Sequence, residues 1–400
     1  MISSKDFMGI ESEYGAYNYK PIPVVISKAK GVWVWDPEGN KYLDCLSAYS
    51  AVSQGHLHPE IVSAAKKQLD VLTLTSRAFY NDKLGSFLKK LCEISSLEVA
   101  LPMNTGAEAV ETGIKIARRW GYRVKNVEKD KAEIITCENN FHGRTTTIVS
   151  FSTDEGCRDG FGPFSQGFKS IPFNDPEALE QTITPNTVAF LVEPIQGEAG
   201  VIIPKEGYLK RVREICNKHN VLLITDEIQT GFCRTGKMFC YMHDDIIPDI
   251  LLVGKALGGG IMPVSAAITR HEIMKVITPG SHGSTFGGNP LAAVIGEASI
   301  DVFLNEELDK KSDTLGKYFL EGIRKIDSPL FKEVRGKGLF IAIELTKEAG
   351  DARKYTEQMM KKGILAKETH TYIIRLAPPL IITKEEIDWA LDILHEIFHV

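Results

Sequence analysis

The feature that most constrains the fold of this chain is a regular alternation of apolar runs with amphipathic segments, beginning at about residue 97. The apolar runs are rich in Val, Ile and Leu, as expected of strands in a sheet that is covered on both faces. They lie at residues 99–104, 132–137, 188–195 and 221–228. Helical spacing of apolar residues separates them at 107–121 and 205–219. Alternation of strand and helix predicts an α/β protein with a mostly parallel sheet.

The pattern changes near residue 290, which is where we expect a domain boundary. A long helix at 290–304, a second helix, a single strand at 334–345 and a closing helix at 385–398 are predicted to form a smaller α/β lobe. Near the start, residues 30–46 are predicted to form a hairpin, because Trp and Val alternate around a turn that contains Pro37 and Gly39. We therefore expect an N-terminal segment (1–45) that packs on the small lobe, a large domain (46–290) and a small domain (291–400).

The composition is that of an ordinary globular protein and excludes several classes of function. Of 400 residues, 43% are hydrophobic and 25% are charged, and the net charge of -5 is too small to suggest nucleic acid or an anionic membrane as a partner. Neither a membrane span nor an N-terminal targeting signal is recognisable. The seven cysteines are scattered without C-x-x-C spacing, which is typical of reduced thiols. We expect a cytoplasmic location.

Asp226 and Lys255 each close an apolar run, so both are expected at the same rim of the sheet. An acid and an amine at one rim meet the needs of pyridoxal phosphate, which uses a lysine for covalent attachment and an acid beside its pyridine nitrogen. Other interpretations stay open at this point. Asp226 also suits a helix cap or a buried ion pair, and Lys255 also suits a surface lysine with a buried stem. A P-loop is excluded, because Asp249 stands where that motif needs glycine.

The segment from Asn104 to Ala109 joins a predicted strand to a predicted helix. The N–H groups at a helix amino end suit a phosphate, and Gly106 permits close approach of the backbone. A simple N-cap by Thr105 or Asn104 is the alternative.

Two arginines are candidates for binding carboxylate substrates. Arg375 ends an apolar run just before two prolines, and Arg144 lies in the segment NNFHGRTT. Most arginines are solvated surface charges, but a buried guanidinium binds a carboxylate through its planar fork. Glu198, in QGEAG, is a candidate ion-pair partner that gates one of them.

Residues 395–399 match the zinc-protease pattern H-E-x-x-H through His395, Glu396 and His399. The pattern ends one residue before the last residue of the sequence, so no downstream residue can supply a third ligand. We expect no bound metal, and a zinc hydrolase remains the second class that motifs alone suggest.

Many ordered segments of the chain resemble the class III, pyridoxal-phosphate-dependent aminotransferases. They include LPMNTGAEAVET, NNFHGRTT, VEPIQGEAG, TDEIQTGFCRTG, LLVGKALGGG and HGSTFGGNPLAA, and the match runs from about residue 14 to the carboxyl terminus. The resemblance implies fold type I, with a large domain around a mostly parallel, seven-stranded-type sheet and a smaller α/β lobe. Within the class the chain looks most like the ornithine aminotransferases. Acetylornithine and 4-aminobutyrate aminotransferases remain alternatives because they share the cofactor residues.

The resemblance also implies roles for individual residues. Lys255 corresponds to the lysine that holds the cofactor and moves the proton, and Asp226 to the partner of the pyridine nitrogen. The remaining cofactor-binding positions that it implies are Gly106, Ala107, Phe141, His142, Glu193, Gln229, Ser284 and Thr285. Thr285 is expected to reach the phosphate of a neighbouring subunit, which makes a homodimer the expected active unit.

For the substrate, Tyr19, Tyr49 and Arg144 match residues that hold the α-amino and α-carboxylate groups of ornithine. Glu198 matches the partner of Arg375, which it would release when 2-oxoglutarate enters. The implied reaction moves the δ-amino group of L-ornithine to 2-oxoglutarate and gives glutamate 5-semialdehyde, which cyclises to pyrroline-5-carboxylate, and glutamate. His142 stands where some relatives have a larger aromatic residue and Phe286 where many have tyrosine, and we expect neither to touch the reacting groups directly.

Overall fold

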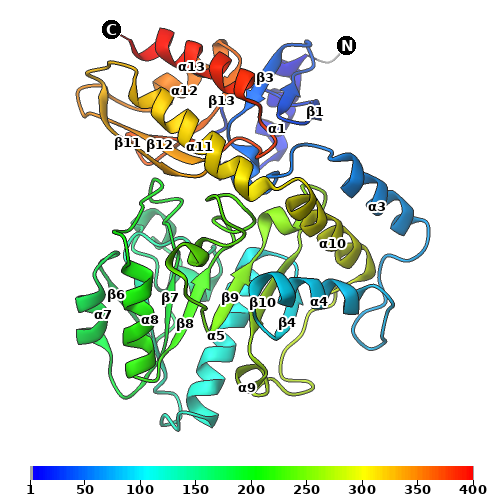
Figure 1. Cartoon of the computed structure of the whole chain (residues 1–400), viewed down its shortest axis with the longest axis vertical. Helices are drawn as coiled ribbons and strands as arrows, with labels where there is room; N and C mark the ends of the chain where they lie inside the picture. The colour runs from blue at the N-terminus through cyan, green and yellow to red at the C-terminus, as the bar shows by residue number, and fades with distance from the viewer. Residues whose placement is uncertain (1–2, 400) are drawn as a thin grey trace.

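The computed structural model describes residues 3–399 and shows a larger body below a smaller lobe (Figure 1). The larger body is built on a seven-stranded sheet with the strand order β4-β10-β9-β8-β7-β5-β6. Its strands are β4 Val99–Met103, β5 Glu133–Cys137, β6 Phe168–Ile171, β7 Thr187–Val192, β8 Leu222–Asp226, β9 Ile250–Val253 and β10 Ser265–Thr269. Only β10 runs in the direction opposite to the other six strands, so the prediction of a mostly parallel α/β sheet is confirmed.

Every residue of β7, β8 and β9 is buried, as expected for strands with helices on both faces. Helix α5 (Gly106–Arg123) packs across β7, β9 and β10, and α8 (Tyr208–Lys218) packs against β8. Helix α10 (Pro290–Asn305) packs on α3 (Pro59–Leu69) and α4 (Leu84–Ser95) of the large body and leads from there to the smaller lobe. The shorter helices of this part are α2 Ser47–Ser50, α6 Thr146–Val149, α7 Pro176–Thr182 and α9 His271–Met274, with 3-10 turns η1 Glu155–Cys157, η2 Cys240–Asp244 and η3 Lys255–Gly258.

The smaller lobe combines both ends of the chain, as the blue and red segments show in Figure 1. One four-stranded sheet has the order β1-β2-β3-β13, and a second has the order β11-β12-β15-β14. Their strands are β1 Lys28–Lys30, β2 Trp33–Trp35, β3 Lys41–Asp44, β11 Phe331–Lys337, β12 Phe340–Leu345, β13 Ile364–Leu365, β14 Lys367–Thr369 and β15 Ile373–Leu376. The helices are α1 Ser4–Tyr14, α11 Leu308–Arg324, α12 Arg353–Lys361 and α13 Lys384–Phe398. The predicted hairpin is confirmed, since Trp33 pairs with Leu43 across β2 and β3, and β13 pairs parallel to β3.

One predicted element is wrong. The single strand expected at residues 334–345 is a hairpin of β11 and β12, in which Lys337 pairs with Phe340. Gly338 makes the turn with φ +58°, a left-handed conformation that glycine adopts easily. The sequence shows no break at this turn because Leu339 and Phe340, directly after Gly338, are both fully buried and therefore apolar.

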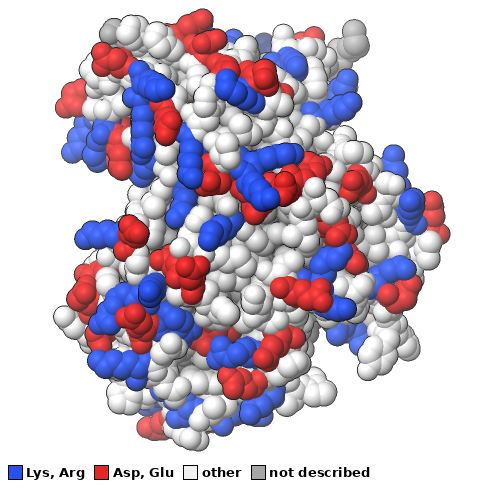
Figure 2. Space-filling view, viewed as in Figure 1, with Lys and Arg blue, Asp and Glu red and all other residues white. Residues whose placement is uncertain are grey.

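The described residues, 3–399, contain no helix that is long and apolar enough to cross a membrane. All seven cysteines are free thiols. On the face shown in Figure 2, basic and acidic side chains are interspersed over both parts of the molecule.

Candidate active site

A cavity of about 200 Å³ lies at the carboxyl ends of three adjacent parallel strands. Asp226 is the last residue of β8, Glu193 directly follows β7, and Lys255 begins η3 just after β9. Ligands of open α/β sheets bind at this rim. The cavity is lined by Gly106, Ala107, Phe141, His142, Gly143, Glu193, Ile195, Glu198, Asp226, Ile228, Gln229, Thr230 and Lys255.

Asp226 and His142 form a buried pair at the floor of the cavity. The Oδ2 atom of Asp226 lies 2.7 Å from Nδ1 of His142, and its Oδ1 atom accepts a hydrogen bond from the backbone N–H of Ile228. Burial disfavours the imidazolium of His142, but the hydrogen bond and charge of Asp226 outweigh it and raise the pKa of His142. His142 thus contacts Asp226 directly, and the expectation that it does not touch the reacting groups stays a prediction.

Glu193 is the second buried acid of this site. Its carboxylate accepts hydrogen bonds from the backbone N–H groups of Phe141, at 3.0 Å, and Gly197, at 3.4 Å. Burial raises the pKa of Glu193 to about 7, against the opposing influence of His142. The floor of the cavity thus combines two buried acids and a buried imidazole, and the imidazole is hydrogen-bonded to one of the acids.

Lys255 is half-buried and extends into the cavity from a residue with φ +44°. Non-glycine residues adopt this left-handed conformation rarely, and such strain gathers at functional sites. Burial lowers the pKa of Lys255, although the charge of Glu198 acts in the opposite direction. A lowered pKa increases the fraction of neutral amine, which is the form that acts as a nucleophile or a base.

The amino end of α5 forms one wall. Thr105 is the N-cap of α5, and Thr105 and Glu108 form a capping box. The interpretation of this segment as a helix N-cap is therefore confirmed. The first-turn N–H groups of Gly106 and Ala107 lie at the cavity with the positive end of the helix dipole. A Cβ atom at Gly106 would come within 3.1 Å of the Ile228 side chain, so glycine lets Ile228 reach the cavity wall. The sequence does not predict a role for Ile228, whose only signal is its place two residues after Asp226.

Glu198, which lines the cavity, forms an ion pair with the buried Arg375. Nη1 of Arg375 lies 2.7 Å from Oε1 of Glu198, and Nε2 of Gln229 donates to the same oxygen at 3.1 Å. The guanidinium lies 5.2 Å from the ring centre of Tyr49. Burial opposes the charge on Glu198, but Arg375 and Lys255 lower the pKa of Glu198 overall. The guanidinium of Arg375 and the carboxylate of Glu198, which a substrate carboxylate can replace, therefore lie near the amine of Lys255.

Six residues named from the resemblance lie outside the cavity lining: Tyr19, Tyr49, Arg144, Ser284, Thr285 and Arg375. Tyr19 and Arg144 are exposed, although the guanidinium of Arg144 lies 5.6 Å from the Phe141 ring centre at the cavity edge. Ser284 bonds to Asn104, next to the α5 cap, and Thr285 is exposed. The H-E-x-x-H residues lie elsewhere, at the end of α13, where Glu396 pairs with Lys362. Among residues 3–399 no group of three or more His, Cys, Asp or Glu side chains is placed to hold a metal.

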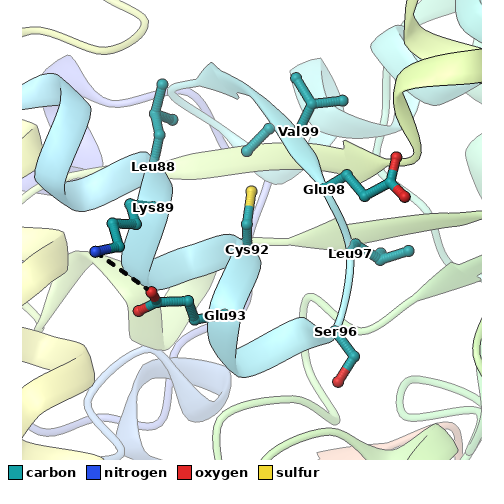
Figure 3. Close-up of a pocket in the computed structure, with 9 residues that line it drawn as sticks. Leu88, Lys89, Cys92, Glu93, Ser96, Leu97, Glu98 and Val99 are labelled. Carbon is teal, nitrogen blue, oxygen red and sulfur yellow. Dashed lines mark ion pairs between the residues drawn. The ribbon is translucent and has the colours of Figure 1, made fainter.

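A larger hollow of about 470 Å³ lies between α4 and β4 at the outer edge of the sheet (Figure 3). Its polar lining includes Lys89 and Glu93, which pair with each other at 3.7 Å, and the half-buried Cys92. These groups do not form an acid–base arrangement of the kind that lines the cavity at Lys255. We therefore assign the chemistry to the smaller cavity.

The residues of the smaller cavity fit pyridoxal phosphate. The buried carboxylate of Asp226 suits a protonated ring nitrogen, and the α5 amides suit a phosphate. Nε2 of His142 is buried without a hydrogen-bond partner among the described residues, so polar capacity remains beside Asp226. Phe141 and Ile228 supply apolar walls, and Lys255 supplies the amine.

Comparison with known proteins gives a consistent picture. The family model described as aminotransferase class-III matches residues 14–398. A protein of Brevibacillus brevis named ornithine aminotransferase is 58% identical over 97% of this chain and 96% of its own length. A solved structure of an ornithine aminotransferase from Toxoplasma gondii, described with partial occupancy of PLP at its active site, superposes with a TM-score of 0.98 at 46% identity, over 99% of this chain and 94% of that one. An acetylornithine aminotransferase from Elizabethkingia anophelis superposes with a TM-score of 0.90, also at 46% identity, over 100% and 99%.

Proposed function

We propose that this chain, which belongs to the aminotransferase class-III family, is a pyridoxal-phosphate-dependent ornithine δ-aminotransferase. It would move the δ-amino group of L-ornithine to 2-oxoglutarate and so form glutamate 5-semialdehyde, which cyclises to pyrroline-5-carboxylate, and glutamate. The observation that carries the substrate assignment is the Glu198–Arg375 ion pair beside Lys255. The names of the full-length relatives support the same assignment.

Bound pyridoxal phosphate would act as a sink for the electron pair left on the substrate carbon when that carbon loses a proton. Lys255 is proposed to take this proton on Nζ and return it at the next step, a role that its lowered pKa supports. Asp226 would keep the ring nitrogen protonated, and His142 would hold the Asp226 carboxylate in place. The α5 amides of Gly106 and Ala107 would bind the phosphate, and Phe141, Glu193, Gln229, Ser284 and Thr285 complete the proposed cofactor site.

The ion pair explains how one site can accept two substrates of different charge. The δ-carbon of ornithine carries no carboxylate, so Arg375 would be a buried, unpaired cation without Glu198, and such a charge is costly. The reacting carbon of 2-oxoglutarate does carry a carboxylate, which can replace Glu198 on the guanidinium. Tyr19, Tyr49 and Arg144 are proposed to bind the α-amino and α-carboxylate end of ornithine and so direct its δ-amine toward Lys255.

Three further proposals follow from the same resemblance. Thr285 is exposed and outside the cavity of its own chain, which supports a homodimer in which it reaches the partner's phosphate. The seven free thiols support a cytoplasmic location. The pairing of β3 with β13 supports an N-terminal segment (1–45) that packs on a small domain (291–400), with the large domain at 46–290.

The proposal is tested by adding L-ornithine, N-acetylornithine and 4-aminobutyrate in parallel to the cofactor-loaded enzyme and following the cofactor absorbance. Ornithine should convert the cofactor with an apparent second-order rate constant at least about tenfold above the other two, a difference of about 1.4 kcal/mol. A faster reaction with N-acetylornithine would show that N-acetylornithine, not ornithine, is the preferred substrate. No spectral change with any of the three would contradict the aminotransferase assignment itself.

A further inference from the structure

Tyr49 lies in a backbone turn with an unusual conformation. Residues Ser47, Ala48, Tyr49 and Ser50, which make up α2, have φ angles of 43°, 48°, 59° and 70°. None of them is glycine, and L-residues adopt the left-handed region as single residues rather than as runs. A left-handed run of four such residues persists only if its surroundings impose it.

The turn determines where the Tyr49 ring lies. The ring faces the Arg375 guanidinium at 5.2 Å, and Arg375 in turn binds Glu198. Burial, followed by the negative charge of Glu198, raises the pKa of Tyr49, so its hydroxyl keeps the proton and can donate a hydrogen bond to a carboxylate. In an extended backbone the Cα–Cβ bond of Tyr49 would point in another direction, and the ring would no longer face Arg375.

Arg234 is the residue that ties this turn to the rest of the molecule. It is fully buried, and burial lowers its pKa to about 9, so it remains charged at neutral pH. Nη2 donates to Oγ of Ser47 at 3.3 Å and to Oγ of Ser53 at 2.9 Å, and Nη1 donates to the carbonyls of Leu339 and Pro378. None of these four acceptors is an acid, so the cation serves to hold neutral groups in place.

The bonds of Arg234 reach the turn at both ends. Ser47 is the first residue of the turn, and its hydroxyl donates a hydrogen bond to the carbonyl of Ala377 at 2.6 Å. The hydroxyl of Ser53 donates a hydrogen bond at 2.9 Å to the carbonyl of Ser50, which is the last residue of the turn. Leu339 and Pro378 belong to the smaller lobe, on either side of β12 and β15, so Arg234 sets the turn against the lobe that carries Arg375.

We propose that Arg234 is a positioning residue for substrate selection, which holds the left-handed turn so that Tyr49 faces Arg375 and the enzyme prefers amines that carry a distal α-carboxylate. The inference rests on the proposed function, because it takes ornithine as the preferred amine. It assigns Arg234 no contact with the substrate. The effect is transmitted through Ser47, Ser53 and the backbone of the turn.

The test compares kcat/KM for L-ornithine with kcat/KM for 4-aminobutyrate, an amine without the α-carboxylate end. Arg234→Met and Ser53→Ala should each lower the ornithine to 4-aminobutyrate ratio about tenfold, the effect of one misplaced hydrogen bond. Arg234→Lys keeps the charge but loses the planar fork, so its ratio should fall between those of Arg234→Met and the wild type.

Arg213→Met is the control for the loss of a largely buried arginine whose side chain is 13% exposed. Arg213 pairs with Asp249 at 2.6 Å and lines a separate cavity, so this variant should lose stability and keep the wild-type ratio. If Arg234→Met does not fold, Ser53→Ala decides, because it removes only one hydroxyl. If folded Ser53→Ala and Arg234→Met keep the ornithine to 4-aminobutyrate ratio of the wild type, the role of Arg234 is overturned. If the unmodified enzyme itself does not prefer ornithine, the proposed function is overturned instead.

Discussion

Asp226, His142 and Glu193 meet beneath the cavity although they come from three separate segments of the chain. The contact between Asp226 and His142 joins residues 84 positions apart in the sequence. Its consequence is electrostatic: the pKa of His142 is raised, chiefly because the bond and charge of Asp226 outweigh burial, and burial raises the pKa of Glu193 to about 7. The protonation of the cavity floor is therefore coupled to the stability of the fold.

The Glu193→Gln variant should change how stability depends on pH. The folded pKa of Glu193, about 7, lies above the ordinary glutamate pKa of 4.5, so the folded state binds this proton more tightly. The free energy of unfolding of the wild type should fall as pH rises from about 4.5 through about 7, by up to about 3 kcal/mol from this group. Urea unfolding at about pH 5 and about pH 8 should show a smaller fall in the variant.

Glu214→Gln is the control for this experiment, because Glu214 is exposed on α8 and should leave the wild-type pH dependence in place. An equal loss of stability with pH in wild type and Glu193→Gln would contradict the buried, proton-binding role of Glu193.

At the residue scale, the sequence was informative wherever a polar residue interrupts an apolar pattern. Asp226 and Lys255 were placed correctly at one rim because each ends a buried strand. The Asp226–His142 contact and the approach of Ile228 to Gly106 could not be predicted in this way. Both depend on which segments pack together in three dimensions.

At the scale of elements, the hairpin of β11 and β12 turns on Gly338 in an especially crowded place. A Cβ atom at this position would lie 2.5 Å from the carbonyl carbon of Thr235 and 2.6 Å from the carbonyl oxygen of Arg234. The turn therefore packs backbone against backbone, just where Arg234 binds the carbonyl of Leu339.

The Gly338→Ala variant should lower the free energy of unfolding by about 2–4 kcal/mol, since it combines an unfavourable φ with a clash against rigid backbone. Gly350→Ala is the matched control, because Gly350 also has a positive φ, +78°, but nothing within 4 Å of the added Cβ. That control should lose only about 1–2 kcal/mol. Equal losses in chemical denaturation of the two variants would show that the packing of the turn contributes nothing.

The prediction of elements succeeded for long, periodic segments and failed at turns and at strand direction. Helices α5, α8, α10 and α13 were all expected close to their observed bounds. The turn at Gly338 was not predicted because the buried apolar residues Leu339 and Phe340 follow it directly, with no run of polar residues to indicate a turn. Strands β6 and β10 were not anticipated, and the antiparallel direction of β10 depends on the path of the chain between strands.

At the scale of the whole molecule, several aromatic side chains are left on the surface of the single chain. Tyr17 is 89% exposed and Phe79 is 71% exposed, and Tyr80 is fully exposed. Large apolar groups left in water favour contact with another molecule, so these residues are candidates for an interaction surface. The sequence could not locate this surface by pattern alone, because exposure is a property of the folded chain.

We expect the protein to have at least twice the 44.3 kDa mass of one chain in solution. Light scattering coupled to size exclusion measures this directly. Thr285→Ala should leave the mass unchanged and weaken cofactor retention, because the exposed hydroxyl is proposed to reach the partner's phosphate. Monomers that retain the cofactor and full activity would refute both the homodimer and the role of Thr285.

The account depends above all on Lys255 as the amine that holds the cofactor. Borohydride reduction of the loaded enzyme, followed by proteolysis and mass spectrometry, fixes a pyridoxyl phosphate group on the attached lysine. We predict that the modified peptide contains Lys255, and that Lys255→Ala lacks the modification and loses at least about 10³-fold in turnover while Lys210→Ala, an exposed α8 control, keeps both. Modification of a different lysine, or full turnover in Lys255→Ala, would contradict the assignment.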